Sequence, residues 1–186
     1  MSIFLALALI TGQSATPTPQ DALPQSAEAI DWDKEFGAEK RVADTVTGEL
    51  PVDAYVQSED NVGAKPFQGD ALARALGGQA GIKAIVERLV ELSKADPRIE
   101  AIFQNQDMVR LRRTLFEQIC FIANAGCSYT GRDMKAAHKG LGITRADMNA
   151  LVENLQRAMR EQRVPFAAQN RLLAKLAPME RDIQER

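Results

Sequence analysis

The sequence predicts an all-α protein, a small sandwich of helices that follows an irregular N-terminal extension. Beyond Asp70, apolar residues recur three and four positions apart, as on one face of a helix, and no segment alternates like a half-buried strand. Before that point, prolines lie among acidic and small polar residues. Charged residues make up 26% of the 186, and the formal net charge is -2, so no basic surface is expected to attract nucleic acid.

The chain begins with an uncharged apolar run from Met1 to Ile10. This run is too short to span a bilayer, but it has the length of the hydrophobic segment of an export signal. We therefore expect residues 1–29 to be an export signal and leader, with no membrane span after processing, in a periplasmic or secreted protein. The alternative is a cytoplasmic protein with a disordered tail, because the usual preceding basic residues are missing.

Residues 30–70 are expected to form an irregular extension, and residues 71–186 a helical domain. Aromatic residues scattered through the extension suggest that parts of it lie against the domain. In the domain, a brief helix from Ala71 to Leu76 should end at Gly77-Gly78, a pair that permits a sharp turn. The next helix should run to about Ala95, before Asp96-Pro97. Its apolar stripe is Ile82, Ile85, Val86, Leu89 and Val90.

Asp107 can cap the following helix, which Gly126 closes. A loop over residues 128–131 then leads to a short helix from Arg132 to Lys139, ended by Gly140 and Gly142. Thr144 should cap the next helix, and the last should start near Pro165 and run to Ile183. One side of the Asp107-capped helix carries Met108, Leu111, Leu115, Gln118, Ile119 and Ile122.

The chain contains one histidine, His138, and two cysteines, Cys120 and Cys127. These residues cannot form a serine or cysteine triad beyond a single base, and their spacing does not suit zinc. The cysteines are seven positions apart, about 10 Å if both were helical, which is too far for a disulfide. They could pair only if the chain turned back near residues 124–126. An isolated histidine near a helix end is ordinarily a surface side chain that meets the helix dipole favourably.

The residues around His138 change that interpretation. The stretch from Tyr129 to Ile143, Tyr-Thr-Gly-Arg-Asp-Met-Lys-Ala-Ala-His-Lys-Gly-Leu-Gly-Ile, resembles the signature around the iron-binding histidine of the truncated haemoglobins, specifically their first group. The resemblance extends from about Leu76 to Ile183. It includes Gly77-Gly78, Asp96-Pro97-Arg98-Ile99, Phe103 and Leu176-Ala177-Pro178.

The resemblance implies a two-over-two helical sandwich, the truncated globin fold, with haem between the helix of residues 107–125 and the helix of His138. His138 would be the only protein ligand of an iron that is five-coordinate when reduced. Its other ring nitrogen could donate to a carbonyl about one turn earlier. Phe103 corresponds to a phenylalanine stacked on the haem. The residues expected to line the pocket are Met134, Ile143 and Met148 on the proximal side, and Val90, Leu111, Leu115, Gln118 and Ile119 on the distal side; plain core packing is the alternative.

The expected distal face lacks the family's usual hydrogen-bond donors. Val90 and Leu115 stand where many members carry tyrosine and glutamine, and Leu111 also faces the iron. An apolar face favours carbon monoxide and nitric oxide relative to oxygen, the ligand that gains most from a donor. As a hypothesis, Gln118 replaces the missing donor, in which case Gln118→Leu should speed oxygen release several-fold. A partly exposed or backbone-bonded glutamine is the alternative. Arg110 or Arg112 could meet a haem propionate, and a solvated side chain is the alternative for at least one of them.

The function expected from the resemblance is reversible binding of a diatomic gas, oxygen, nitric oxide or carbon monoxide, at the haem iron, including oxygen transport. An enzymatic alternative is nitric oxide dioxygenation, which requires a separate reductase because no flavin or nicotinamide site is visible. A third alternative is a haemless helical module that uses its surface for interaction. The sequence favours a gas-binding protein over an enzyme.

Overall fold

The computed structural model describes residues 41–184, and throughout this part of the chain every regular element is helical. The expected export signal and leader, residues 1–29, lie outside the described residues. The elements are η1 (Glu59–Val62), α2 (Ala71–Ala75), α3 (Gly78–Lys94), α4 (Glu100–Phe103), α5 (Met108–Ile122), α6 (Met134–His138), α7 (Arg145–Glu161), α8 (Phe166–Leu176), η2 (Ala177–Met179) and α9 (Glu180–Ile183).

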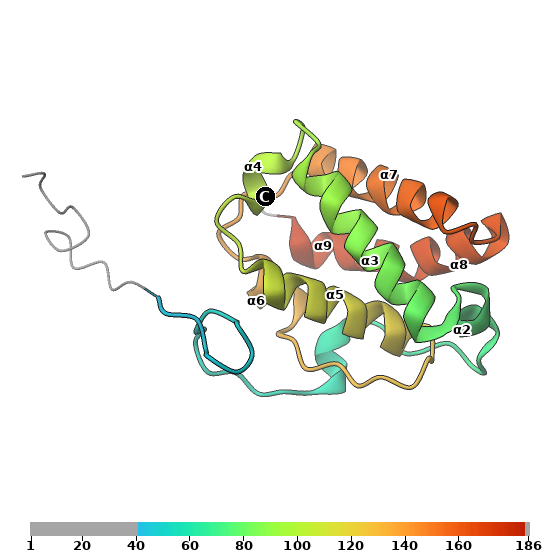
Figure 1. Ribbon diagram of the computed structural model, residues 1–186, viewed down its shortest axis with the longest axis horizontal. Helices are drawn as coiled ribbons and strands as arrows, with labels where there is room; N and C mark the ends of the chain where they lie inside the picture. Colours follow the sequence, from blue (N-terminus) through green and yellow to red (C-terminus); the bar gives the residue numbers. More distant parts are fainter. Residues whose placement is uncertain (1–40, 185–186) are drawn as a thin grey trace, which may run out of the picture. The chain divides into compact units, whose positions relative to one another are not determined.

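The long helices form a two-over-two sandwich, as the sequence predicts. Helix α3 packs against both α5 and α7, and α7 packs against α8 (Figure 1). The short helix α6 contacts α9 at the end of the chain. The buried core joins apolar side chains from α3, α5, α7 and α8, with Ile82, Ile85, Ile122, Met159 and Leu172 among the residues that are fully buried. Burial of these stripes is the main stabilising force for helices of this length.

Helix boundaries follow the expected capping residues. The Asp107 carboxylate accepts hydrogen bonds from the backbone of Val109 and Arg110 at 3.0 and 2.9 Å, which satisfies two free N–H groups at the start of α5. Thr144 begins α7 with a reciprocal capping box to Asp147. Gly77 turns the chain into α3 with a φ of +82°, a conformation that favours glycine.

Two expected boundaries were wrong. Helix α6 begins at Met134 rather than Arg132, because Asp133 is extended and acts as its N-cap, and it ends at His138 because Lys139 is extended. The expected last helix is divided into α8, η2 and α9. Pro178 has no N–H to donate to the carbonyl four residues earlier, so the helix cannot continue through it.

Residues 41–70 are irregular except for η1, but they are attached to the helices. Residues 30–40 of the expected extension lie outside the described residues. The Phe67 N–H donates to the Ile122 carbonyl at 2.9 Å, and the Phe67 ring lies beneath the cations of Arg171 and Lys175, 5.0 and 4.8 Å from its centroid. Tyr55 and Phe67 are partly buried, as expected, whereas Val56 is exposed. Within residues 41–184, no helix has the length and apolar character needed to cross a membrane.

Cys120 and Cys127 form a disulfide, with their Cα atoms 5.6 Å apart. The chain turns back after α5 through two left-handed residues, Asn124 at a φ of +58° and Gly126 at +84°. The bond therefore forms under the one condition that the sequence left open, a reversal at residues 124–126. It joins the end of α5 to the loop that leads toward α6.

Candidate functional site

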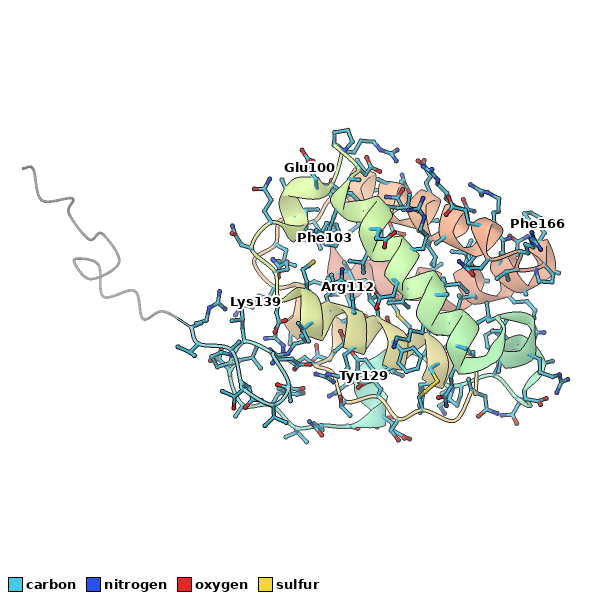
Figure 2. All side chains as sticks on the ribbon, viewed as in Figure 1. Glu100, Phe103, Arg112, Tyr129, Lys139 and Phe166 are labelled. Atoms are coloured by element: carbon cyan, nitrogen blue, oxygen red, sulfur yellow. A yellow bond between two sulfur atoms is a disulfide. The ribbon has the colours of Figure 1, made fainter. Side chains whose placement is uncertain are left out.

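Helix α6 has only five residues, so its position depends on individual hydrogen bonds at its ends. The Asp133 carboxylate accepts from the Ala136 N–H at 2.8 Å. The Tyr129 hydroxyl donates to the Arg132 carbonyl at 2.9 Å, and burial raises the pKa of Tyr129 to about 12, which keeps the hydroxyl protonated. Gly131 lies against the Tyr129 ring so closely that any Cβ would overlap it. These contacts fix the loop of residues 129–131, which precedes the helix. Tyr129 is labelled in Figure 2.

His138, the last residue of α6, is partly buried and held in one orientation. Its Nδ1 lies 2.7 Å from the Met134 carbonyl oxygen, one turn earlier. A carbonyl only accepts, so Nδ1 carries the proton and donates, and Nε2 keeps its lone pair. No group among residues 41–184 hydrogen-bonds that Nε2. This tautomer and one-turn contact are those expected for a histidine that ligates a metal.

The environment of His138 keeps the imidazole neutral. Burial is the largest effect and lowers the pKa of His138 below its usual range; the hydrogen bond to Met134 opposes the shift, and the positive charge of Arg132 adds to it. A neutral imidazole is the form that binds iron, so no proton has to be displaced near neutral pH. The described residues include no cluster of three or more His, Cys, Asp or Glu that could hold a metal by itself. A metal at His138 would need ligands that come with a cofactor.

The other predicted pocket residues lie on five helices and one loop. Val90 on α3 and Ile143 after α6 are buried, yet both lie outside the main core cluster. Met134 and Ile119 are buried within that cluster. The partly buried members are Phe103 at the end of α4, Leu111 and Leu115 on α5, and Met148 on α7. Apolar side chains that are only partly buried on α4, α5 and α7 can accept further contact from a flat apolar group.

Gln118 is buried and its amide already has partners. Its Nε2 donates to the Val62 carbonyl at 3.2 Å and lies 3.3 and 3.5 Å from the sulfur atoms of Met134 and Met179. The structure therefore favours the backbone-bonded alternative for this residue over a distal donor. The sequence pattern gave no indication of this, because the partner at Val62 lies 56 positions away.

Arg110 and Arg112 both have partners within the chain. Arg112 on α5, which is labelled in Figure 2, donates to Glu87 on α3 at 2.8 Å. Arg110 donates from Nε to Glu49 at 3.0 Å and from Nη2 to the Leu50 carbonyl at 2.7 Å. Its Nη1 is buried and has no hydrogen-bond partner among the described residues. Such a nitrogen has an unused capacity for an acceptor such as a carboxylate.

Sequence reasoning missed the contribution of Glu49, which lies in a segment without periodicity. Glu49 is only 8% exposed and contacts both Arg110 and Arg113. The hydrogen bond from Arg113 is the main reason why the pKa of Glu49 is lowered, with Arg110 acting in the same direction against burial. A lone acidic residue two positions before a proline carries no signal that could have identified this contact.

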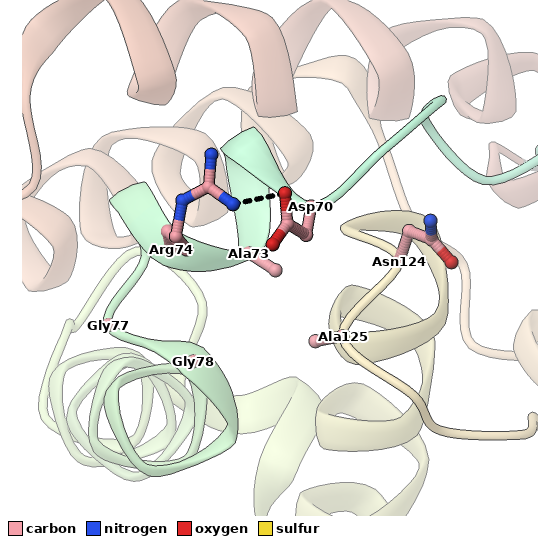
Figure 3. A pocket seen from close by; sticks show the side chains of 7 residues that line it. All are labelled: Asp70, Ala73, Arg74, Gly77, Gly78, Asn124 and Ala125. Atoms are coloured by element: carbon pink, nitrogen blue, oxygen red, sulfur yellow. Dashed lines mark ion pairs between the residues drawn. The ribbon is translucent and has the colours of Figure 1, made fainter.

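A surface hollow of about 460 Å³ lies between the start of α3 and the end of α5 (Figure 3). None of its lining residues belongs to the predicted site. Its polar side chains are already engaged, since Arg74 pairs with Asp70 and the Asn124 amide donates to the Gly69 carbonyl at 3.2 Å. This hollow is therefore not assigned to the function of His138.

Three features of the described residues suit an iron porphyrin. A fixed neutral imidazole presents a free nitrogen. Apolar side chains on α4, α5 and α7 retain exposed surface. One buried arginine nitrogen lacks an acceptor and could serve a propionate carboxylate.

Comparison with known proteins identifies the fold and the family. The profile of a family described as bacterial-like globin matches residues 72–185. The group 1 truncated hemoglobin of Tetrahymena pyriformis is 30% identical over 95 residues, which cover 51% of this chain and 78% of that protein. The group 1 truncated hemoglobin of Mycolicibacterium paratuberculosis is 27% identical over 108 residues, 58% of this chain and 79% of its own.

Two solved structures are also similar to this chain. The Fe(III) form of the truncated hemoglobin from Tetrahymena pyriformis has a TM-score of 0.59 and 25% identity, covering 62% of this chain and 98% of that one. The 2/2 hemoglobin from Synechococcus sp. PCC 7002, in the cyanomet state with covalently attached heme, has a TM-score of 0.57 at the same identity and coverage. Since the family profile spans more than half of the sequence and the helices adopt the same arrangement, the chain belongs to the bacterial-like globin family.

Proposed function

We propose that this protein is a haem-binding globin that reversibly binds a diatomic gas, with His138 as the one protein ligand of the iron. The observation that carries the proposal is the contact of His138 Nδ1 with the Met134 carbonyl oxygen. This contact fixes the orientation of the ring and leaves Nε2 free to bind a metal. A bound haem supplies an iron that coordinates a small gas molecule reversibly. Family membership and the haem-containing relative from Synechococcus support the cofactor.

On the distal side, the chain's role is to exclude water and offer an apolar surface. Val90, Leu111 and Leu115 have no side-chain donor, and the amide of Gln118 is engaged by Val62. A donor to a partly charged ligand contributes about 1.5–3 kcal/mol, roughly a factor of ten to a hundred in affinity. Bound oxygen therefore lacks the stabilisation that a hydrogen-bond donor would give. Carbon monoxide and nitric oxide depend less on such a donor.

Arg110 is the residue that we assign to a haem propionate. Its unpartnered Nη1 provides the donor, while Nε and Nη2 remain on Glu49 and Leu50. Because Arg110 is anchored on two sides, its guanidinium is already oriented before a carboxylate arrives.

We also infer that the protein is exported. The disulfide between Cys120 and Cys127 supports this assignment, because such bonds persist in oxidising compartments outside the cytosol. The apolar run before Thr11 is a second support. Recovery of the intact chain from the cytosolic fraction of cells that carry the native gene would contradict it.

The proposed function is tested by titrating the purified chain with hemin and recording its absorption spectrum. Wild type should give a one-to-one complex with a sharp Soret band, and its reduced form should shift on addition of carbon monoxide. His138→Ala should lose the five-coordinate histidine spectrum, which added imidazole restores. Lys139→Ala, at the exposed neighbouring position, is the matched control and should match wild type. Identical spectra for wild type and His138→Ala would overturn the proposal.

A further inference from the structure

The segment of residues 44–63, called the strap below, lies outside the part of the chain that matches the globin family, which starts at residue 72. Its first anchor is on α5. Glu49 accepts hydrogen bonds from Arg110 Nε and Arg113 Nη2, both at 3.0 Å, and a further one from Arg113 Nε. The next residue, Leu50, donates its N–H to the Asp107 carboxylate at 2.8 Å. The strap thus binds the first two turns of the helix on which Leu111 and Leu115 lie.

The middle of the strap is attached to the loop that leads into α6. The Tyr55 hydroxyl donates to the Thr130 carbonyl at 2.7 Å, and the Asn61 amide donates to the Gly131 carbonyl at 3.2 Å. Thr130 is also bound to α5, because its N–H donates to Glu117 at 2.9 Å and its hydroxyl contacts Arg113. One network therefore connects Glu49, the helix α5 and the loop before His138.

The end of the strap reaches α6 itself. Gly63 adopts a φ of +82°, and a Cβ there would lie 3.3 Å from the side chain of Met179 and 3.4 Å from that of Met134. Met134 is the residue whose carbonyl orients the His138 ring. The preceding residue, Val62, accepts the Gln118 amide from α5. Through these contacts the strap touches both helices that would enclose the haem.

We propose that Glu49 is a positioning residue for haem retention, acting through Arg110 and Arg113 to hold the strap across the two sides of the haem site. This proposal rests on the proposed function, since it concerns the same pocket. Glu49 faces two arginine side chains that are 20% and 35% exposed. Without its charge, the two guanidinium groups keep only Asp107 and Glu117 as acidic partners among the described residues. The strap then keeps on α5 only the contacts of Leu50 with Asp107 and Arg110 and that of Val62 with Gln118. Helices α5 and α6 can then separate more often, which releases haem.

The test compares full-length, hemin-loaded variants by the rate at which haem transfers to excess apomyoglobin. Glu49→Gln should lose haem about tenfold faster than wild type, a change that corresponds to about 1.4 kcal/mol. Glu59→Gln is the matched control, since Glu59 is exposed on the same segment and forms no ion pair among the described residues; it should match wild type. Arg113→Gln alone should also accelerate haem loss, because Arg113 binds Glu49, Glu117 and the Thr130 hydroxyl in the same network.

Amide hydrogen exchange distinguishes positioning from general loss of stability. In Glu49→Gln, exchange should accelerate in residues 44–63 and 129–138 and stay unchanged in α7. Tyr55→Phe removes only the hydroxyl that contacts Thr130, and it should accelerate haem loss about threefold. This variant tests the proposal if Glu49→Gln does not fold. If wild type retains no hemin, the proposed function fails and this proposal with it. If wild type retains hemin and Glu49→Gln loses it at the rate of Glu59→Gln, or exchange accelerates uniformly, only the role of Glu49 is overturned.

Discussion

Helices α3 and α5 are fixed by stripes of isoleucine, valine and leucine side chains, whereas the strap is fixed by one buried carboxylate and a series of single hydrogen bonds. Apolar burial is cooperative and spread over many contacts, so it tolerates small changes at most positions. A network of polar contacts depends on each member. We therefore expect substitutions in the helices to change global stability, and substitutions in the strap to change the haem site first.

The largest change in the free energy of unfolding is expected from a substitution at Gly81 in α3, in the region fixed by apolar packing. Alanine normally stabilises a helix relative to glycine by about 1 kcal/mol. A Cβ at position 81, however, would overlap the Leu76 carbonyl oxygen in the turn between α2 and α3. Gly81→Ala should therefore lower the free energy of unfolding by about 3 kcal/mol, as overpacking does. Urea unfolding measures this change, with Lys83→Ala at an exposed position of the same helix as the control. A stabilised Gly81→Ala protein would show that the turn adapts freely.

An intermediate effect is expected at Gln118, where the two regions meet. Gln118→Leu leaves the buried Val62 carbonyl without its partner, at a cost of about 1–2 kcal/mol in unfolding free energy. Since the amide is engaged there, oxygen release should stay within about twofold of wild type. Flash photolysis gives the oxygen off-rate and urea unfolding the stability. If Gln118→Leu released oxygen several times faster than wild type with unchanged stability, Gln118 would instead be the distal hydrogen-bond donor.

The smallest effect is expected from protonation of Glu49. Its folded-state pKa is lowered, so its ion pairs with Arg110 and Arg113 contribute in full above about pH 4.3, the usual value for glutamate, and are lost as the pH falls through the folded value. Asp107 and Glu117 also face these arginines. The difference in unfolding free energy between wild type and Glu49→Gln should stay constant from pH 7 to about pH 5 and then shrink. A difference that grows with acidification would contradict the assignment.

The sequence predicts the helical region well because its information is local. The spacing of Ile82, Ile85 and Leu89 and the cap at Asp107 define α3 and α5 without any knowledge of tertiary structure. The role that we propose for His138 came from resemblance alone, since a five-residue helix has no apolar stripe to identify it. The contacts of Arg110 could not be predicted, because Glu49 lies 61 positions away in a region with no period. For the same reason the strap was expected to be merely irregular.

The bond between Cys120 and Cys127 has a chemical consequence that follows from unequal burial. Cys120 is completely buried, whereas Cys127 is partly accessible, so an incoming thiolate must attack the sulfur of Cys127. The departing sulfur is then that of Cys120, whose anion is disfavoured by its apolar neighbours. Exchange is slow when the leaving thiol is a weak acid. Once oxidised, the protein should keep this cross-link through exposure to mild thiols that open more accessible bonds.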